Sequence, residues 1–124
     1  MLDDKKYADF VLSVTSDYSR DYDDFAYRMN KLDQHNIDVP ALLTGALGLT
    51  GESGEVADHV KKIIFHGKDD WEDRREKLKL ELGDVMWYVM QMCRALDVSL
   101  DEIIQLNIEK LSNRHNQGGF KNDY

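Results

Sequence analysis

Four acidic residues form two pairs, each with a spacing of three residues. Glu52 and Glu55 make the first pair, and Glu81 and Asp84 make the second. Side chains three positions apart leave an α-helix on the same face, so each pair can direct two carboxylates toward one point. Four carboxylates held close together repel one another, and either raised pKa values or a bound hard cation relieves that repulsion.

The surroundings of Glu81 strengthen this interpretation. An apolar stripe flanks it (Leu78, Leu82 and Val85), so the carboxylate is expected on or beside a buried face, where an unpaired charge is destabilising. Oxygen ligands without a matching histidine or cysteine favour Mg²⁺, with Mn²⁺ possible, over zinc. The alternative is acidic decoration of solvated helix faces. A di-iron site is disfavoured because no histidine follows Glu52 or Glu81 by three residues.

Apolar residues recur at helical spacing through most of the chain, and no stretch predicts a strand or hairpin. The sequence therefore predicts an all-α fold, a bundle of four to five helices in one domain over residues 1–124. The predicted helices cover residues 7–18 and 22–32 (or one broken helix), 38–67, a segment after the polar stretch 68–75 that ends near 96–97, and 99 to about 115. The tail 120–124 is expected to be loosely held.

Three glycines interrupt the predicted third helix at three-residue intervals, Gly48, Gly51 and Gly54. Each glycine in a helix interior costs roughly 1 kcal/mol relative to alanine. We therefore expect a neighbouring backbone or a ligand to approach the helix closely there.

Charge and cysteine content narrow the function further. The net charge of -8 disfavours binding to a nucleic-acid backbone, although a metal could still recruit a small anionic substrate. Cys93 is the only cysteine, which excludes an internal disulfide and favours a reducing, cytoplasmic setting. The N-terminus lacks a signal-peptide core, and the longest apolar run (85–90) is far shorter than the ~20 residues of a membrane span.

The acidic pairs stand in segments that resemble a known family. Residues 51–55 (GESGE) and 81–84 (ELGD), with 25 residues between the pairs, resemble the E-x-x-E…E-x-x-D motif of the MazG-type all-α nucleoside triphosphate pyrophosphohydrolases. Residues 107–114 resemble the closing N-x-x-K-L-x-x-R segment of that family. The resemblance covers about residues 42–120 and is strongest to the compact single-domain proteins of bacteria and their phages.

This resemblance implies hydrolysis of a (d)NTP to a (d)NMP and pyrophosphate with Mg²⁺, in the cytoplasm, or the host cytoplasm if the chain is phage-encoded. It implies assembly as a homodimer or as a dimer of dimers, a homotetramer. All four family metal positions are present, as Glu52, Glu55, Glu81 and Asp84. Either Glu52 or Glu55 is expected to take the proton from the attacking water.

Four further residues are candidates for substrate binding. Asn107, Lys110 and Arg114 share one face of the predicted last helix, with Lys110 and Arg114 suited to phosphate and Asn107 to a place near the metal. Lys62 shares a helix face with Glu55. The alternatives are solvated salt-bridging faces and a lysine that stabilises a helix C-terminus. His59 is expected to pack or to be exposed rather than to bind metal.

Two other interpretations of the function remain open at this stage. Within the same enzyme class, the chain could be specialised for dUTP, dCTP or phosphoribosyl-ATP. From a different class, it could be a non-catalytic helical dimer that binds a nucleotide or a protein.

Aromatic residues at helical spacing are expected chiefly in a core or an interface, and one of them could stack on a base (Tyr7, Phe10, Tyr18, Trp71, Trp87 and Tyr88).

Overall fold

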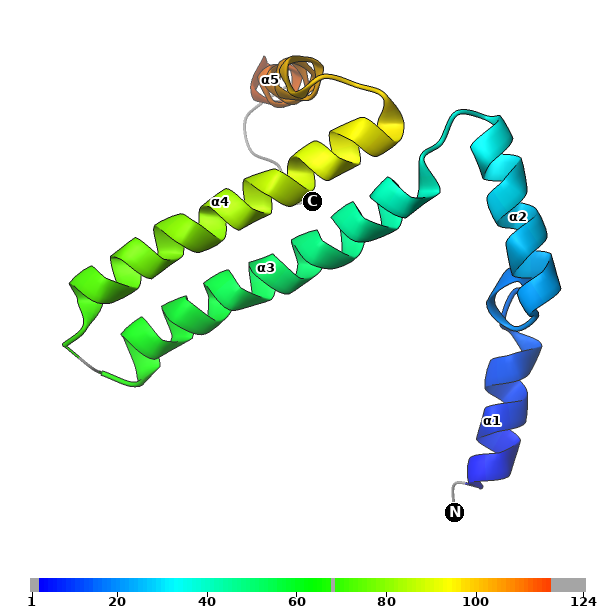
Figure 1. The fold of residues 1–124 in the computed structure, drawn as a ribbon. Helices are drawn as coiled ribbons and strands as arrows, with labels where there is room; N and C mark the ends of the chain where they lie inside the picture. Colours follow the sequence, from blue (N-terminus) through cyan, green and yellow to red (C-terminus); the bar gives the residue numbers. More distant parts are fainter. Residues whose placement is uncertain (1–2, 68, 117–124) are drawn as a thin grey trace. The chain divides into compact units, whose positions relative to one another are not determined.

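The computed structural model describes residues 3–67 and 69–116, and every regular element among them is helical (Figure 1). The all-α fold class is confirmed. The elements are α1 (Asp4–Ser13), the 3-10 turn η1 (Asp17–Ser19), α2 (Tyr22–Gln34), α3 (Val39–Phe65), α4 (Trp71–Leu96) and α5 (Leu100–Asn116). The predicted tail and the glycines at 118 and 119 lie outside the described residues.

Contacts divide the chain into two compact units, Met1–Val39 and Pro40–Tyr124. In the first unit, the predicted helix over 7–18 is shorter than expected because α1 ends at Ser13. The hydroxyls of Ser13 and Thr15 donate to carbonyls of the preceding turn at 2.7 and 2.6 Å. Such local bonds offer the backbone an alternative to the helix. Whether residues 1–124 behave as one domain stays a prediction.

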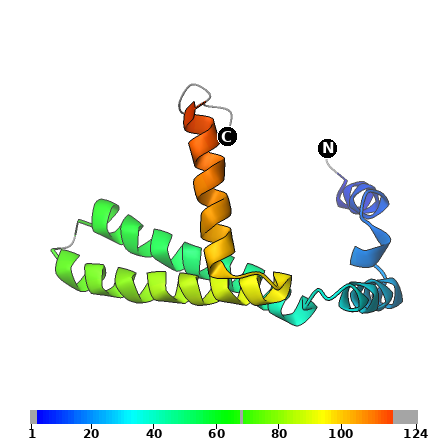
Figure 2. The ribbon, with the colours of Figure 1, turned by 90° about the horizontal axis from the view of Figure 1, so that it is seen from above.

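The second unit is built on a hairpin of two long helices, α3 and α4, which run antiparallel and side by side (Figures 1 and 2). Gly67 follows α3 with φ of 58°, the left-handed conformation that commonly ends a helix, as predicted. The next helix begins at Trp71, within the stretch 68–75 that was expected to separate the helices. Acidic residues in its first turn and two i,i+4 ion pairs, Arg74–Asp70 and Lys77–Asp73, favour this early start.

One of the three interior glycines allows close helix packing. The ring of Tyr88 lies so near Gly48 that a methyl group there would overlap it. Gly45 plays a similar part against Met92, whose sulfur would lie 2.8 Å from such a methyl. Gly51 and Gly54, in contrast, have no atom of the described residues near enough to contact an added methyl. Gly48 is therefore approached closely, by a side chain rather than by the expected backbone or ligand, and the expectation stays a prediction at the other two.

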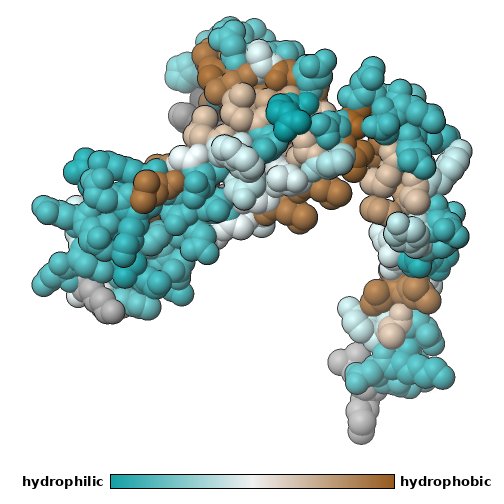
Figure 3. Space-filling model, viewed as in Figure 1, coloured by the Kyte–Doolittle hydropathy of each residue, from teal (hydrophilic) through white to brown (hydrophobic). Residues whose placement is uncertain are grey.

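Few apolar side chains are buried in the single chain. Among the described residues the buried apolar side chains are Ala41, Cys93 and Ala95, where α3 begins and α4 ends. The aromatics expected in a core are largely exposed (Tyr7, Phe10, Tyr18, Trp71 and Trp87). Figure 3 shows mostly hydrophilic residues where α3 ends and α4 begins, with apolar residues gathered nearer the other end of the hairpin. A core location for these aromatics is wrong for the single chain; an interface location stays a prediction.

The last helix, α5, begins directly after Ser99, within one residue of its predicted start. The backbone N–H of Glu102 donates to the Ser99 hydroxyl at 3.0 Å, which satisfies one of the free donors of the first turn.

In the part of the chain that the structure describes, none of the helices has an apolar stretch that could cross a membrane.

Candidate metal centre

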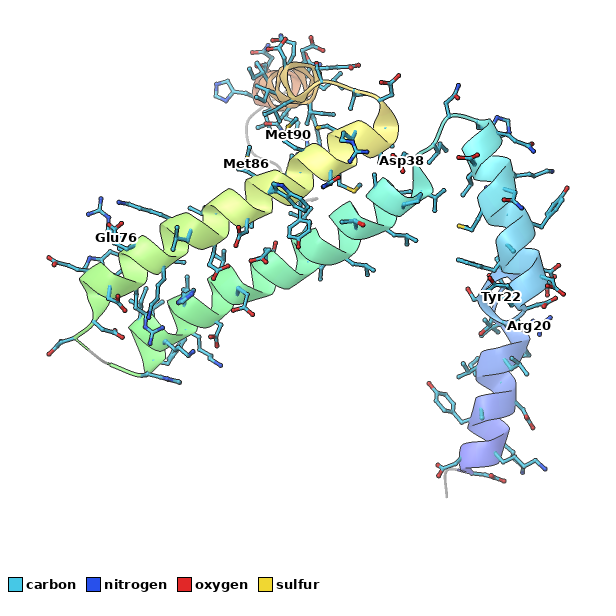
Figure 4. All side chains as sticks on the ribbon, viewed as in Figure 1. Arg20, Tyr22, Asp38, Glu76, Met86 and Met90 are labelled. Atoms are coloured by element: carbon cyan, nitrogen blue, oxygen red, sulfur yellow. The ribbon has the colours of Figure 1, made fainter. Side chains whose placement is uncertain are left out.

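The hairpin brings the two acidic pairs to the same level of α3 and α4. Tyr88 packs on Gly48 on one side of this level, and His59 meets Arg74 on the other, at 3.3 Å between Nδ1 and Nη1. Side chains of the two helices meet in the space between them (Figure 4). Antiparallel packing of the two helices therefore places Glu52 opposite the α4 pair.

Three carboxylates converge between the helices. Glu52 from α3 and Glu81 and Asp84 from α4 each offer an oxygen, and these oxygens all lie within 4.8 Å of one another. Glu52 and Glu81 are half-buried, while Asp84 is exposed. The Oε2 atom of Glu52 is buried and has no hydrogen-bond partner among the described residues. A buried carboxylate oxygen without a donor is destabilising unless a cation or a proton binds it.

The electrostatics of the cluster agree with its geometry. A hydrogen bond to Glu81, which Glu52 can make only when it carries a proton, is the largest cause that raises the pKa of Glu52 above its ordinary value. Burial adds to the increase, and so do the charges of Asp84, Glu81 and Glu55. The cluster therefore holds a proton on Glu52 more tightly than an ordinary glutamate does, and a divalent cation could take the place of that proton. Oxygen-only ligands suit Mg²⁺ or Mn²⁺.

The fourth predicted ligand, Glu55, lies outside the group of three converging oxygens. Its side chain is exposed on α3. It is nevertheless near enough for its charge to raise the pKa of Glu52. Glu55 thus borders the cluster, and its assignment as a metal ligand stays a prediction.

Lys62 makes an ion pair on its own helix. Its Nζ lies 2.8 Å from Oδ2 of Asp58, and Lys61 approaches the other oxygen of the same carboxylate at 3.4 Å. Hydrogen bonding from Lys62 is the main cause that lowers the pKa of Asp58. Asp58 therefore holds the lysine near the exposed edge of α3, one to two turns beyond Glu55.

The three candidate residues on the last helix are less closely tied to the cluster. Asn107 and Lys110 are exposed on α5, and Arg114 is half-buried. Among the described interactions of Asn107 and Lys110, none reaches the four carboxylates. Their predicted roles toward phosphate therefore remain proposals.

A polar network beside the cluster was missed in the sequence. His59 lies between Arg74 and Glu81, with Nε2 at 3.7 Å from Oε1 of Glu81, and Arg74 pairs with Asp70. Spacing contained a signal: His59 follows Glu52 by seven residues, and Arg74 precedes Glu81 by seven. Residues seven apart lie on the same face of a helix. Asp70 directly precedes α4, but its side chain makes no capping hydrogen bond.

An all-α hairpin with a cluster of acidic oxygens is an arrangement that could hold a divalent cation. Residues 42–119 match the model of the MazG nucleotide pyrophosphohydrolase domain. The chain belongs to this family. The resemblance predicted from the two acidic pairs is therefore confirmed, and the matched region contains every residue of the cluster.

A phage protein is also similar to the chain. The Gene 37 protein of Mycobacterium phage L5 is 47% identical over 74 residues, which are 58% of this chain and 64% of that protein. The chain thus spans less than two thirds of the length of this relative, whose name describes no activity. No solved structure matches the chain.

Proposed function

We propose that this chain is a Mg²⁺-dependent nucleoside triphosphate pyrophosphohydrolase that converts a (d)NTP to a (d)NMP and pyrophosphate. The observation that carries this function is the convergence of Glu52, Glu81 and Asp84 within 4.8 Å, around a buried carboxylate oxygen that has no partner among the described residues. Membership of the nucleotide pyrophosphohydrolase family supports the reaction type. Mn²⁺ is expected to replace Mg²⁺ because both prefer carboxylate oxygens.

The residues divide between binding the cation and handling the proton. Glu52, Glu81 and Asp84 would hold the cation, which when bound supplies charge neutralisation at phosphate and a more acidic water. Glu55 is exposed beside them and lies outside the converging group. It is therefore better placed than Glu52 to reach the attacking water and accept its proton.

Cationic residues would hold the triphosphate. Lys62, presented by Asp58 at 2.8 Å, can give up that partner or share it when phosphate arrives. Lys110 and Arg114 would supply further charge and Asn107 a polar contact near the metal. Charge-assisted hydrogen bonds to phosphate oxygens are among the stronger polar contacts available to a protein.

Self-association would bury apolar side chains that are exposed in the single chain. Large apolar side chains are widely exposed in the single chain, for example Leu47 at 72% and Leu80 at 71%. Extended apolar surface of this kind marks interaction sites in soluble proteins. We therefore propose a homodimer or a homotetramer as the active form.

A substrate panel tests the proposed function. Purified protein is incubated with canonical and modified (d)NTPs, including dUTP and dCTP, and with phosphoribosyl-ATP, and pyrophosphate and orthophosphate are measured separately. Pyrophosphate release that requires Mg²⁺ and is abolished by EDTA, Glu52→Gln or Asp84→Asn is expected. Release of orthophosphate would contradict the reaction type. Tight nucleotide binding without turnover would instead favour a non-catalytic binding module.

A further inference from the structure

A line of four polar side chains leads from the start of α4 to the carboxylate cluster. Asp70 Oδ2 lies 3.0 Å from Nε of Arg74, and Nη1 of Arg74 lies 3.3 Å from Nδ1 of His59. On its other side, Nε2 of His59 lies 3.7 Å from Oε1 of Glu81. The histidine comes from α3, Arg74 and Glu81 come from α4, and Asp70 directly precedes α4, so the line crosses between the helices and back.

The chemistry of arginine decides which ring nitrogen faces Glu81 with a hydrogen. A guanidinium group has only N–H donors, so Nδ1 of His59 must accept from Arg74. The ring hydrogen of the neutral imidazole is then on Nε2, the atom directed at Glu81. At 3.7 Å the contact is longer than the roughly 3 Å of an N–H···O bond, and a small side-chain shift would close it.

Burial argues that the line is more than a surface ion pair. The side chains of His59 and Arg74 are each only 12% exposed, in a hairpin that buries few other groups. Polar groups placed there are destabilising unless each is paired. Asp70 forms an i,i+4 ion pair with Arg74, although Nε of Arg74 makes no hydrogen bond among the described residues. That pair alone would leave the imidazole and the Glu81 carboxylate without orientation.

We propose that His59 is a positioning residue for Glu81, held by Arg74, which Asp70 anchors in turn. A neutral imidazole can orient a carboxylate through one N–H without adding a positive charge that would compete with a divalent cation. Partners of this kind, bonded to a metal ligand rather than to the metal, tune metal affinity. This inference shares one assumption with the proposed function, that the carboxylate cluster binds a divalent cation, and rests on the proposed function in no other way.

Two substitutions separate orientation from packing. In His59→Gln, the side-chain amide can reach the position of Nε2 and donate a hydrogen bond to Glu81. In His59→Asn, the shorter side chain reaches only the position of Nδ1, so it cannot donate to Glu81. The Mn²⁺ dissociation constant is measured on the full chain without nucleotide, by the EPR signal of free Mn²⁺. We expect His59→Asn to weaken Mn²⁺ binding about 10- to 100-fold, which is the usual loss of metal affinity when a residue that hydrogen-bonds to a metal ligand is replaced. His59→Gln is expected to stay near the wild-type value, and so is the exposed-residue control His66→Asn.

A substitution of Arg74 tests the same proposal independently if His59→Asn does not fold. Arg74→Lys keeps the charge but loses the planar fork that holds the imidazole, so Mn²⁺ binding is expected to weaken in the same direction. Substitution of the exposed neighbour, Arg75→Lys, is the matched control. Thermal unfolding of the cation-free variants reports packing separately from metal affinity.

The outcomes distinguish this inference from the proposed function. If both His59 variants bind Mn²⁺ like the wild type and only lower the melting temperature, His59 merely packs and the inference is wrong. If the wild type and variants show the expected order of Mn²⁺ affinity but no (d)NTP is hydrolysed, the positioning role stands and the enzymatic function fails. A wild-type protein that binds no Mn²⁺ would overturn both.

Discussion

Glu52 on α3 and Glu81 on α4 bring carboxylate oxygens within 4.8 Å of each other, and this neighbour is the main cause of the raised pKa of Glu52. The two residues are far apart in the sequence, so their repulsion exists only in the folded chain. Folding therefore works against these two charges until a proton or a cation joins them. Stability of the protein and occupancy of the cluster should consequently be linked.

The first prediction concerns Glu52 itself. In cation-free protein near pH 7.5, Glu52→Gln should raise the melting temperature, because it removes a repelling charge, while activity falls at least 100-fold. Differential scanning calorimetry and pyrophosphate release measure the two effects. Glu76→Gln is the control: Lys79 lowers the pKa of this exposed glutamate, so its loss should not stabilise the protein. A lower melting temperature for Glu52→Gln would contradict the repulsive cluster.

The second prediction is a pH dependence of stability. Because the pKa of Glu52 is raised above its ordinary 4.5 in the folded protein, the folded state binds this proton more tightly than the unfolded chain. The resulting stabilisation is complete below about pH 4.5 and is lost as pH rises through the raised pKa. As the pH rises above about 4.5 and through the raised pKa, the free energy of unfolding of cation-free wild type should therefore fall relative to Glu52→Gln. Urea denaturation checks this, and saturating Mg²⁺ should remove the difference.

The third prediction separates the two neighbouring glutamates. Glu55 lies outside the converging oxygens, so Glu55→Gln should lower kcat about 100-fold or more, as loss of a general base does, while Mn²⁺ affinity changes little. Glu52→Gln should lower both kcat and Mn²⁺ affinity. Steady-state kinetics and EPR titration of Mn²⁺ measure the two quantities. Equal loss of Mn²⁺ affinity in both variants would instead make Glu55 a metal ligand.

The fourth prediction uses two glycines of the same helix. Gly48→Ala should destabilise the protein by about 1–3 kcal/mol, because the new methyl overlaps the Tyr88 ring. The methyl of Gly51→Ala meets no atom of residues 3–67 and 69–116, and this substitution should stabilise the protein by up to about 1 kcal/mol through helix propensity. Chemical denaturation measures both. If Gly51→Ala destabilises and also weakens self-association, a second copy contacts α3 at that position.

The fifth prediction tests assembly. Leu47 is 72% exposed on α3, so Leu47→Glu should shift the protein from a dimer or tetramer toward the monomer. Size-exclusion chromatography with light scattering measures the mass in solution. Gln105→Glu introduces the same side chain at an exposed polar position of α5 and should leave the mass unchanged. A wild type that is monomeric at all concentrations would contradict the proposed assembly.

Much of the fold could be predicted from the sequence because its signals are local. Apolar periodicity located α3, α4 and α5, and the stops at Gly67 and the cap at Ser99 depend on hydrogen bonds and dihedral angles within a few residues. The boundaries that differ, the end of α1 and the start of α4, were decided by side-chain hydroxyls and by i,i+4 ion pairs. These boundaries could not be predicted from apolar periodicity, because it carries no information about such local polar contacts.

The sequence alone determined which residues could form the site, because a three-residue spacing puts Glu52 with Glu55 and Glu81 with Asp84 on any helix. Only the tertiary structure decided which of them meet. The register of α3 against α4, limited by Tyr88 on Gly48, brings Glu52 to Glu81 and Asp84 but leaves Glu55 at the edge. It also placed His59 between Arg74 and Glu81. Such contacts depend on the relative shift of two helices, which no periodicity within one helix encodes.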